Sequence, residues 1–256
     1  MSRIASLKGK KSFVGFLTGG DPNLDKTYDY ILDMAEAGAD LIEIGVPFSD
    51  PIAEGVVIQD ANIRALSVGT TTDGIFDCVE KVRKKTQVPL VLLTYANPVY
   101  TYGKDKFFSK CEAVGIDGVI VPDVPFEEKA EFSEEAKAHG IDLISMIAPT
   151  SDERITKIAS EAQGFLYIVS SMGVTGVREK ITTDVKSIVE KAKAATDIPV
   201  FIGFGISTPE QVHEYTSYAD GAIVGSAIVK IIAKNGENAS EELKEYVKAM
   251  KAGTEH

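Results

Sequence analysis

The sequence predicts a single α/β domain folded as a (β/α)8 barrel, also called a TIM barrel. Its 256 residues come close to the length of about 250 that is typical of this fold. Short runs rich in β-branched residues alternate with longer amphipathic segments along almost the whole chain. This alternation also fits a doubly wound open sheet, but eight repeats within this length favour a closed barrel. No Pro/Gly/Ser linker divides residues 1–256, so one domain is expected.

Eight short apolar segments are the expected strands. Their near-continuous apolarity is typical of parallel strands that are covered on the outside by helices. The expected strands are residues 12–17, 40–45, 89–95, 118–121, 142–147, 165–170, 199–203 and 221–224.

Amphipathic segments between these runs are the expected helices. Several of them begin with an acidic residue or a Ser/Thr cap, as is usual at a helix N-terminus. Gly-Ala-Asp at 38–40 and Gly-Ile-Asp at 115–117 and 140–142 each end a helix and precede an apolar run, because glycine stops the helix. The expected helices include residues 25–37, 73–85, 126–139, 152–161, 184–195 and 209–218.

The spacing of the strands predicts extended loops after strands two and six. The steps from residue 40 to 89 and from 165 to 199 are longer than the others, and both contain irregular sequence directly after the strand. Active sites of barrels are built at this face. Long loops there often act as lids, although a surface insertion without function is the alternative.

Composition excludes several classes of partner. The net charge is −11 and no basic stripe stands out, whereas nucleic acids and anionic membranes require clustered Lys and Arg. No apolar stretch is long enough for a signal peptide or a membrane helix, so the chain is expected to be cytoplasmic. The widely spaced Cys78 and Cys111 are expected to be reduced structural thiols. His139, His213 and His256 form no ligand pattern, and no metal site is expected.

Three glycine-bearing turns follow the last three expected strands, at residues 172–176, 203–207 and 224–227. Glycine lets backbone amides approach an anion, and the start of a following helix adds oriented N–H donors. Barrels frequently bind phosphate in these loops, although tight turns alone would also use glycine. No Lys or Arg lies inside the three turns, so binding is expected to depend mainly on amide dipoles.

An acidic residue interrupts the second expected strand. Glu43 lies in an otherwise apolar run, where burial of a carboxylate is costly unless the group is paired or partly hydrated. Its position near the carboxyl end of a strand favours catalysis over a structural ion pair. Glu54 follows in the next loop, and two carboxylates at one mouth can serve as proton donor and charge stabiliser. These residues predict a metal-free lyase or isomerase that acts on a small phosphorylated substrate.

Residues 43–59, Glu-Ile-Gly-Val-Pro-Phe-Ser-Asp-Pro-Ile-Ala-Glu-Gly-Val-Val-Ile-Gln, resemble the tryptophan synthase alpha subunit family. The resemblance extends over nearly the whole chain, and several motifs in the right order make it specific. The further motifs are Thr-Gly-Gly-Asp-Pro at 18–22, Tyr-Ala-Asn-Pro at 95–98, Pro-Asp-Val-Pro at 122–125, Gly-Val-Thr-Gly at 173–176 and Gly-Phe-Gly-Ile-Ser at 203–207.

The resemblance implies a lyase that splits indole-3-glycerol phosphate into indole and glyceraldehyde 3-phosphate in a retro-aldol sense. Glu43 matches the catalytic glutamate of the family, which protonates C3 of the indole ring and assists removal of the glycerol hydroxyl proton. Tyr167 matches the family tyrosine beside the substrate; a core aromatic residue is the alternative reading of that position.

Glu54 marks a departure from the family pattern. The matching residue is usually an aspartate, which accepts a hydrogen bond from the indole nitrogen and so favours the indolenine tautomer. Glutamate keeps the charge but reaches further by one methylene. The loop is therefore expected to lie slightly differently, or turnover to be altered.

Other matching positions are expected to bind the substrate. Phe16 and Phe204 would flank the indole, and Thr175 matches a lid residue on the second long loop that orders the surroundings of the catalytic acid. The positions that match phosphate-binding residues are Gly176, Gly205, Gly225 and Ser226.

The resemblance also implies a partner. The family works as an α2β2 complex whose β subunit carries pyridoxal phosphate and takes up indole through an internal channel, so no cofactor is expected in this chain. Pro47, Phe48 and Asp50 of the loop after strand two, with residues 97–98, are the expected contact surface; a lid that touches only substrate is the alternative. The short segment before the first strand implies that the helix closing the barrel bottom is curtailed.

Three other functions remain open from the sequence. Another phosphate-binding barrel enzyme would explain the glycine turns but not residues 43–59. A catalytically weak regulatory partner of the β subunit would fit the change at Glu54 but not the retention of Glu43. A free-standing lyase that releases indole is compatible with every motif. Comparing the rate of the isolated chain with its rate in complex separates these functions.

Overall fold

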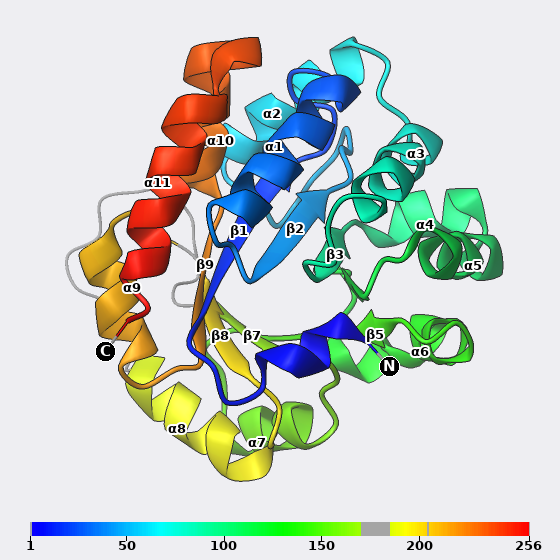
Figure 1. Ribbon diagram of the computed structural model, residues 1–256. Coiled ribbons are helices and arrows are strands. Elements are labelled where there is room, and N and C mark those ends of the chain that lie inside the picture. The colour runs from blue at the N-terminus through cyan, green and yellow to red at the C-terminus, as the bar shows by residue number, and fades with distance from the viewer. Residues whose placement is uncertain (1, 170–184, 204, 256) are drawn as a thin grey trace.

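A computed structural model describes residues 2–169, 185–203 and 205–255, and all its strands form one parallel sheet (Figure 1). Adjacent strands follow the order β5-β4-β3-β2-β1-β9-β8-β7-β6, and every pairing is parallel. The strands are β1 Ser12–Thr18, β2 Leu41–Gly45, β3 Leu90–Leu93, β4 Gly118–Ile120, β5 Asp142–Leu143, β6 Ser145–Ile147, β7 Leu166–Val169, β8 Val200–Gly203 and β9 Gly221–Val224.

The sheet closes through an interrupted fifth strand. β5 pairs with β4 and β6 pairs with β7, and only Ile144 separates the two segments. The Ile144 N–H also donates to the carbonyl of Val119, at 2.9 Å. The nine segments therefore occupy eight strand positions, and the predicted barrel is confirmed. The strand expected over residues 142–147 lies where it was predicted but is divided into two.

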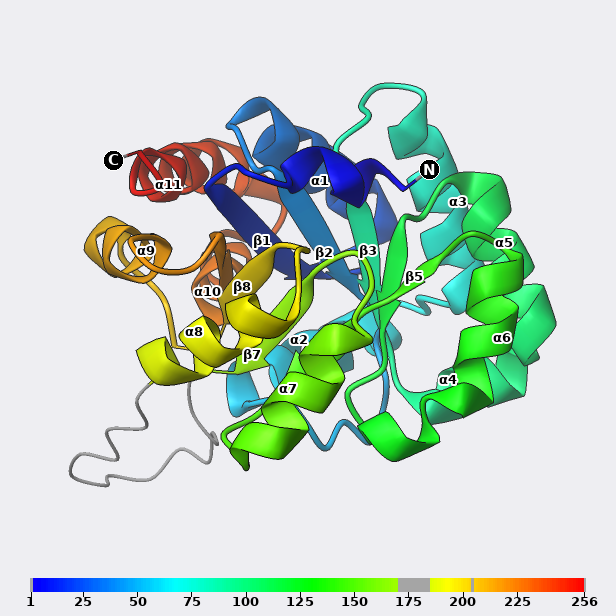
Figure 2. The same ribbon diagram turned by 90° about the horizontal axis from the view of Figure 1, so that it is seen from below.

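Helices surround the strands in both views (Figures 1 and 2). The α-helices are α1 Leu24–Glu36, α2 Val56–Ser67, α3 Thr72–Arg83, α4 Ala96–Tyr102, α5 Lys104–Val114, α6 Ala130–Ala138, α7 Asp152–Ser160, α8 Val185–Ala195, α9 Pro209–Thr216, α10 Ser226–Asn235 and α11 Ser240–Ala252. Short 3-10 helices are η1 Arg3–Leu7, η2 Phe126–Glu128 and η3 Gly236–Asn238.

Each expected helix corresponds to an observed one, and the caps agree with the sequence signals. The Asn23 side chain accepts from the N–H of Lys26 at the start of α1, and Thr208 forms a capping box with Gln211 at the start of α9. The sequence pattern did not predict α2, α4, α5, α10 or α11. After β2 the chain is irregular over residues 46–55 and then forms α2. The long loop expected after the sixth strand falls largely on residues 170–184, outside the described residues.

Alternation along each strand produces two apolar layers. In β2, Ile42 and Ile44 pack outward against the helices, whereas Leu41 faces the interior of the barrel, and Glu43 lies on the same face as Leu41. The interior cluster contains Ile4, Leu7, Val14, Leu41, Val91, Ile120, Ile144, Phe165, Tyr167, Phe201 and Ile223. The outer cluster joins the strands to the surrounding helices.

A single 3-10 turn contributes to the barrel interior from the N-terminus. Ile4 and Leu7 of η1 are buried in the interior cluster. The turn is held by Asp117, which accepts from the Arg3 backbone N–H and guanidinium, each at 3.0 Å. Asp117 also accepts from Arg83 at 2.7 Å and from the Leu90 N–H at 2.9 Å. The N-terminal element is thus short, as expected, and still fills the interior.

Other expectations concern membranes, metals and thiols. No described helix is long and apolar enough to cross a membrane. Within the described residues, no three His, Cys, Asp or Glu side chains gather as a metal site would require. Cys78 and Cys111 are buried free thiols. His139 contacts Glu112 and Asp105 at 2.8 and 3.2 Å, and both acidic side chains are exposed.

Asp117→Ala is expected to destabilise the protein by about 3–5 kcal/mol, because it leaves the largely buried Arg83 without its partner. Urea denaturation measures this change in the free energy of unfolding. The matched control is Asp29→Ala, which breaks a partly exposed pair with Lys26 and should change stability by at most about 1 kcal/mol. Equal effects of the two variants would contradict the prediction.

Candidate active site

A cavity of ≈ 690 Å³ is lined by residues from the carboxyl ends of the strands and the loops that follow them. This is the face at which barrels carry their active sites. Strand residues Phe16, Glu43 and Tyr167 line its interior side. Residues 53–58 and the first turn of α10 line the opposite sides. The cavity therefore combines buried strand side chains with two loop segments.

Glu43 is an unpaired acid inside this cavity. Its side chain is 1% exposed, and Oε1 has no hydrogen-bond partner among the described residues. Phe16 lies beside it in the register of β1 and β2. Burial raises the pKa of Glu43 to about 8, because a carboxylate loses its hydration there. At neutral pH the group is mostly protonated and can act as a proton donor.

Tyr167 lies next to this acid. Burial raises the pKa of Tyr167 well above its ordinary value, and the charge of Glu43 raises it further. Room for the ring depends on Gly203, because a Cβ at that position would lie 2.2 Å from the Tyr167 hydroxyl oxygen. Tyr167 therefore remains a neutral phenol beside Glu43, and Gly203 is needed for close approach rather than for a turn.

Glu54 reaches the same cavity from the loop after β2. Its carboxylate Oε2 accepts from Nδ2 of Asn62 at 2.7 Å. Burial raises the pKa of Glu54, and hydrogen bonds from Asn62 and Tyr95 oppose this rise. Unlike Glu43, this acid has donors that stabilise its charged form.

The loop that carries Glu54 is held by three side chains. The Tyr95 hydroxyl accepts from the Ala53 N–H at 3.1 Å and also donates to Glu54. Gln59 Nε2 donates to the Glu54 carbonyl at 2.8 Å. The rings of Phe48 and Tyr95 pack with centroids 5.3 Å apart. The end of β3 and the start of α2 together fix the position of the glutamate.

Glycine turns also line the cavity. Gly205 has φ +77, a conformation that favours glycine, and it lines the cavity with Gly225 and Ser226. Gly225 is the N-cap of α10, and no side chain caps this helix. The first N–H groups of α10 are therefore available to an anion.

Seven of the ten expected site residues line this one cavity: Phe16, Glu43, Glu54, Tyr167, Gly205, Gly225 and Ser226. The other three, Thr175, Gly176 and Phe204, lie outside the described residues. Sequence reasoning missed Asn62, Tyr95 and Lys230. The Tyr-Ala-Asn-Pro motif was a signal for Tyr95, whereas Asn62 and Lys230 lie on helices that the pattern did not predict.

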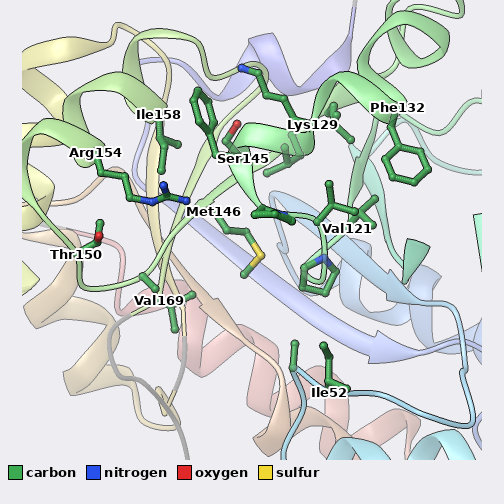
Figure 3. Close-up of a pocket in the computed structure, with 18 of the residues that line it drawn as sticks. Ile52, Val121, Lys129, Phe132, Ser145, Met146, Thr150, Arg154, Ile158 and Val169 are labelled. Atoms are coloured by element: carbon green, nitrogen blue, oxygen red, sulfur yellow. The ribbon is translucent and has the colours of Figure 1, made fainter. Parts of the chain in front are cut away.

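A second cavity of ≈ 620 Å³ adjoins the first (Figure 3). Met146 projects into it, and Val121, Val169 and Ile52 also line its apolar wall. Its cationic residues are already paired: Arg154 with Glu127, and Lys129 with Glu161 at 2.8 Å. An anionic substrate group is therefore expected in the first cavity, beside the glycine turns.

Comparison with known proteins shows which family this chain resembles. The family model described as tryptophan synthase alpha chain matches residues 3–255. The tryptophan synthase alpha chain of Lacticaseibacillus casei is 43% identical over 256 residues, which are 100% of this chain and 96% of the relative. That of Thermoanaerobacter sp. (strain X514) is 47% identical over 247 residues, 95% of this chain and 94% of the relative.

Solved structures agree with the sequence relatives. Tryptophan synthase subunit alpha from Legionella pneumophila str. Paris has a TM-score of 0.89 and 32% identity, with 99% of this chain and 98% of that chain covered. A chain of the tryptophan synthase a2b2 complex from Pyrococcus furiosus has a TM-score of 0.88 and 39% identity, with 95% and 98% covered.

Burial of Glu43 predicts a pH dependence of stability. The folded-state pKa of about 8 lies above the unfolded value of about 4.3, so the folded protein binds this proton more tightly. The contribution of Glu43 to the free energy of unfolding is therefore fully present below the unfolded pKa. It is lost as the pH rises towards the folded pKa, by at most about 1.4 kcal/mol per pH unit.

Glu43→Gln removes this titration and is therefore expected to become more stable than the wild type as the pH rises from 5 to about 8. Denaturant titrations of both proteins at several pH values measure the difference. Parallel curves across this range would show that Glu43 has no raised pKa in the folded state.

Proposed function

We propose that the cavity around Glu43 is the active site of a lyase, because this chain belongs to the tryptophan synthase alpha chain family. The chain cleaves indole-3-glycerol phosphate into indole and glyceraldehyde 3-phosphate, the alpha reaction of tryptophan biosynthesis. The observation that carries the assignment of the site is the buried carboxyl of Glu43, whose Oε1 has no partner among the described residues, in the same cavity as Gly205 and Gly225.

Glu43 supplies the proton that starts the reaction. Its raised pKa keeps the carboxyl protonated at neutral pH, so it can donate to C3 of the indole ring. The carboxylate that results accepts the proton of the glycerol hydroxyl. The bond between indole C3 and the glycerol carbon then breaks, the hydroxyl carbon becomes an aldehyde, and the electron pair returns to the indole ring. Tyr167 lines the wall beside this acid.

Glu54 acts on the indole nitrogen. Its carboxylate, stabilised by Asn62 and Tyr95, accepts the N–H of the ring and so stabilises the positive charge that C3 protonation creates. The same two donors limit the added reach of glutamate relative to aspartate, because they hold the longer side chain back against α2 and the end of β3. Phe16, buried beside Glu43, supplies an apolar surface for the ring.

The substrate phosphate binds at the glycine turns of the cavity. The N–H groups of Gly205, Gly225 and Ser226 are the proposed donors, with the N-terminus of α10 behind them. Thr175, Gly176 and Phe204 complete the site on the family pattern. None of these residues requires a cofactor, so the chain itself is proposed to need none. The chain is also proposed to work in the cytoplasm, as a member of a family of tryptophan biosynthesis.

A β subunit is the proposed partner, since structures from Pyrococcus furiosus are of a tryptophan synthase complex, described in one case as a2b2. Of the expected contact residues, Asp50 and Asn97 are exposed, Phe48 is half-buried, and Pro47 is buried and so contributes no surface. Exposed apolar side chains near this loop extend the candidate surface along α2: Ile52, Val56, Ile63, Leu66 and Val68.

Purified chain incubated with indole-3-glycerol phosphate, with and without a cognate β subunit, tests the proposal through release of glyceraldehyde 3-phosphate. Slow cleavage alone and a large increase with β are expected, because an interface at the mouth would favour the closed loops. Glu43→Gln is expected to lose at least about 100-fold in rate. A wild type that binds β but never cleaves substrate would instead be a regulatory partner.

Tyr95→Phe is expected to lower kcat about tenfold, because Glu54 loses one of its two side-chain donors. Tyr102→Phe is the matched control, since that hydroxyl contacts Asp73 at the surface instead. Steady-state kinetics of both variants measure the difference. Identical kcat values for the two would mean that Tyr95 does not position Glu54.

A further inference from the structure

We propose that Lys230 binds the phosphate group of the substrate by charge, an inference that rests on the proposed function. Sequence motifs indicated a phosphate site that depends mainly on backbone amides, without a cation in the turns. Lys230 lies one helical turn after Ser226 in α10, and both residues line the cavity that contains Glu43. The phosphate site thus includes a positive side chain from outside the turn.

The charges of the cavity single out this lysine. The described acidic residues that line it are Glu43, Glu54 and Glu242, and Lys230 is the one cation among the described lining residues. Glu242 is engaged by Lys234 and Asn235, at 3.0 and 2.8 Å. Lys230 forms no ion pair with any described residue, and its side chain is exposed. A lysine that has no ion-pair partner among the described residues, in a cavity for a phosphorylated substrate, can pair with that phosphate.

Helix geometry directs Lys230 towards the phosphate turn. Residues four apart lie on the same face of a helix, with Cβ atoms about 5–6 Å apart. Side chains of a helix also lean towards its N-terminus, so each covers the turn before its own Cα. The N-terminus of α10 is Ser226, capped by the Gly225 backbone. This tendency favours a position of the Lys230 ammonium group within reach of an anion bound at these two residues.

A cation is needed here for electrostatic reasons. The chain has a net charge of −11, and a dianionic phosphate approaching a mouth that contains carboxylates meets repulsion. Amide dipoles orient an anion but bring no net charge. Lys230 supplies that charge where the phosphate binds, and its exposure lets it act without a large desolvation penalty.

Lys230→Met tests the proposal by steady-state kinetics with indole-3-glycerol phosphate. KM is expected to rise about tenfold, the effect of losing one charge-assisted hydrogen bond, with kcat unchanged, because the phosphate is bound equally in ground and transition states. Calorimetric titration with glycerol 3-phosphate should show a similar loss of affinity. Lys230→Arg, which keeps the charge, should recover most of that affinity.

Lys84→Met is the matched control. It removes the same charge at the C-cap of α3, the end of the helix remote from the barrel mouth, from a side chain that is 68% exposed, and it should leave KM within about twofold. A KM for Lys230→Met equal to that of Lys84→Met overturns the proposal, as does a fall in kcat without a change in KM. Calorimetry does not require turnover, so a chain without lyase activity still reveals whether Lys230 binds phosphate.

Discussion

The burial of one carboxyl group in the barrel wall is the constraint on which the rest of the site depends. The alternation that turns Ile42 and Ile44 towards the helices necessarily turns Glu43 inward. With no donor to Oε1 among the described residues, the neutral acid is favoured, and its pKa rises to about 8. The same burial that makes Glu43 costly for folding makes it a proton donor at neutral pH, so stability and activity are opposed at this residue.

The two acids of the cavity differ because their surroundings differ. Glu43 lies on a rigid strand with only burial acting on its pKa. Glu54 lies on a loop and accepts hydrogen bonds from Asn62 and Tyr95, which favour its charged form. In the proposed mechanism, one fold thereby holds a proton donor and a charge stabiliser in a single cavity. The replacement of aspartate by glutamate is compatible with this division, because the donors determine where the carboxylate ends.

Local signals in the sequence were sufficient for the strands, for the place of Glu43 on the second of them and for Gly205 and Gly225 after the last two, since each depends on a few neighbouring residues. Helix α2 was not predicted because apolar side chains such as Val56 and Ile63 remain exposed on its outer face, leaving little contrast between its two faces. Asn62 was missed with it. The hydrogen bonds of Tyr95 to the loop of Glu54, and the division of the fifth strand at Ile144, depend on contacts between distant segments.

Separation of charge along the cavity connects these features. A cation beside Glu43 would lower the pKa of this acid, so that it would lose its proton at neutral pH. In the described structure no such cation acts on Glu43, because burial alone sets its pKa. The phosphate, in contrast, requires positive charge. Placing Lys230 on α10, one turn after the neutral amides of Gly225 and Ser226, supplies that charge beside the glycine turns. A site that both protonates carbon and binds a dianion therefore needs its cation on a different element from its acid.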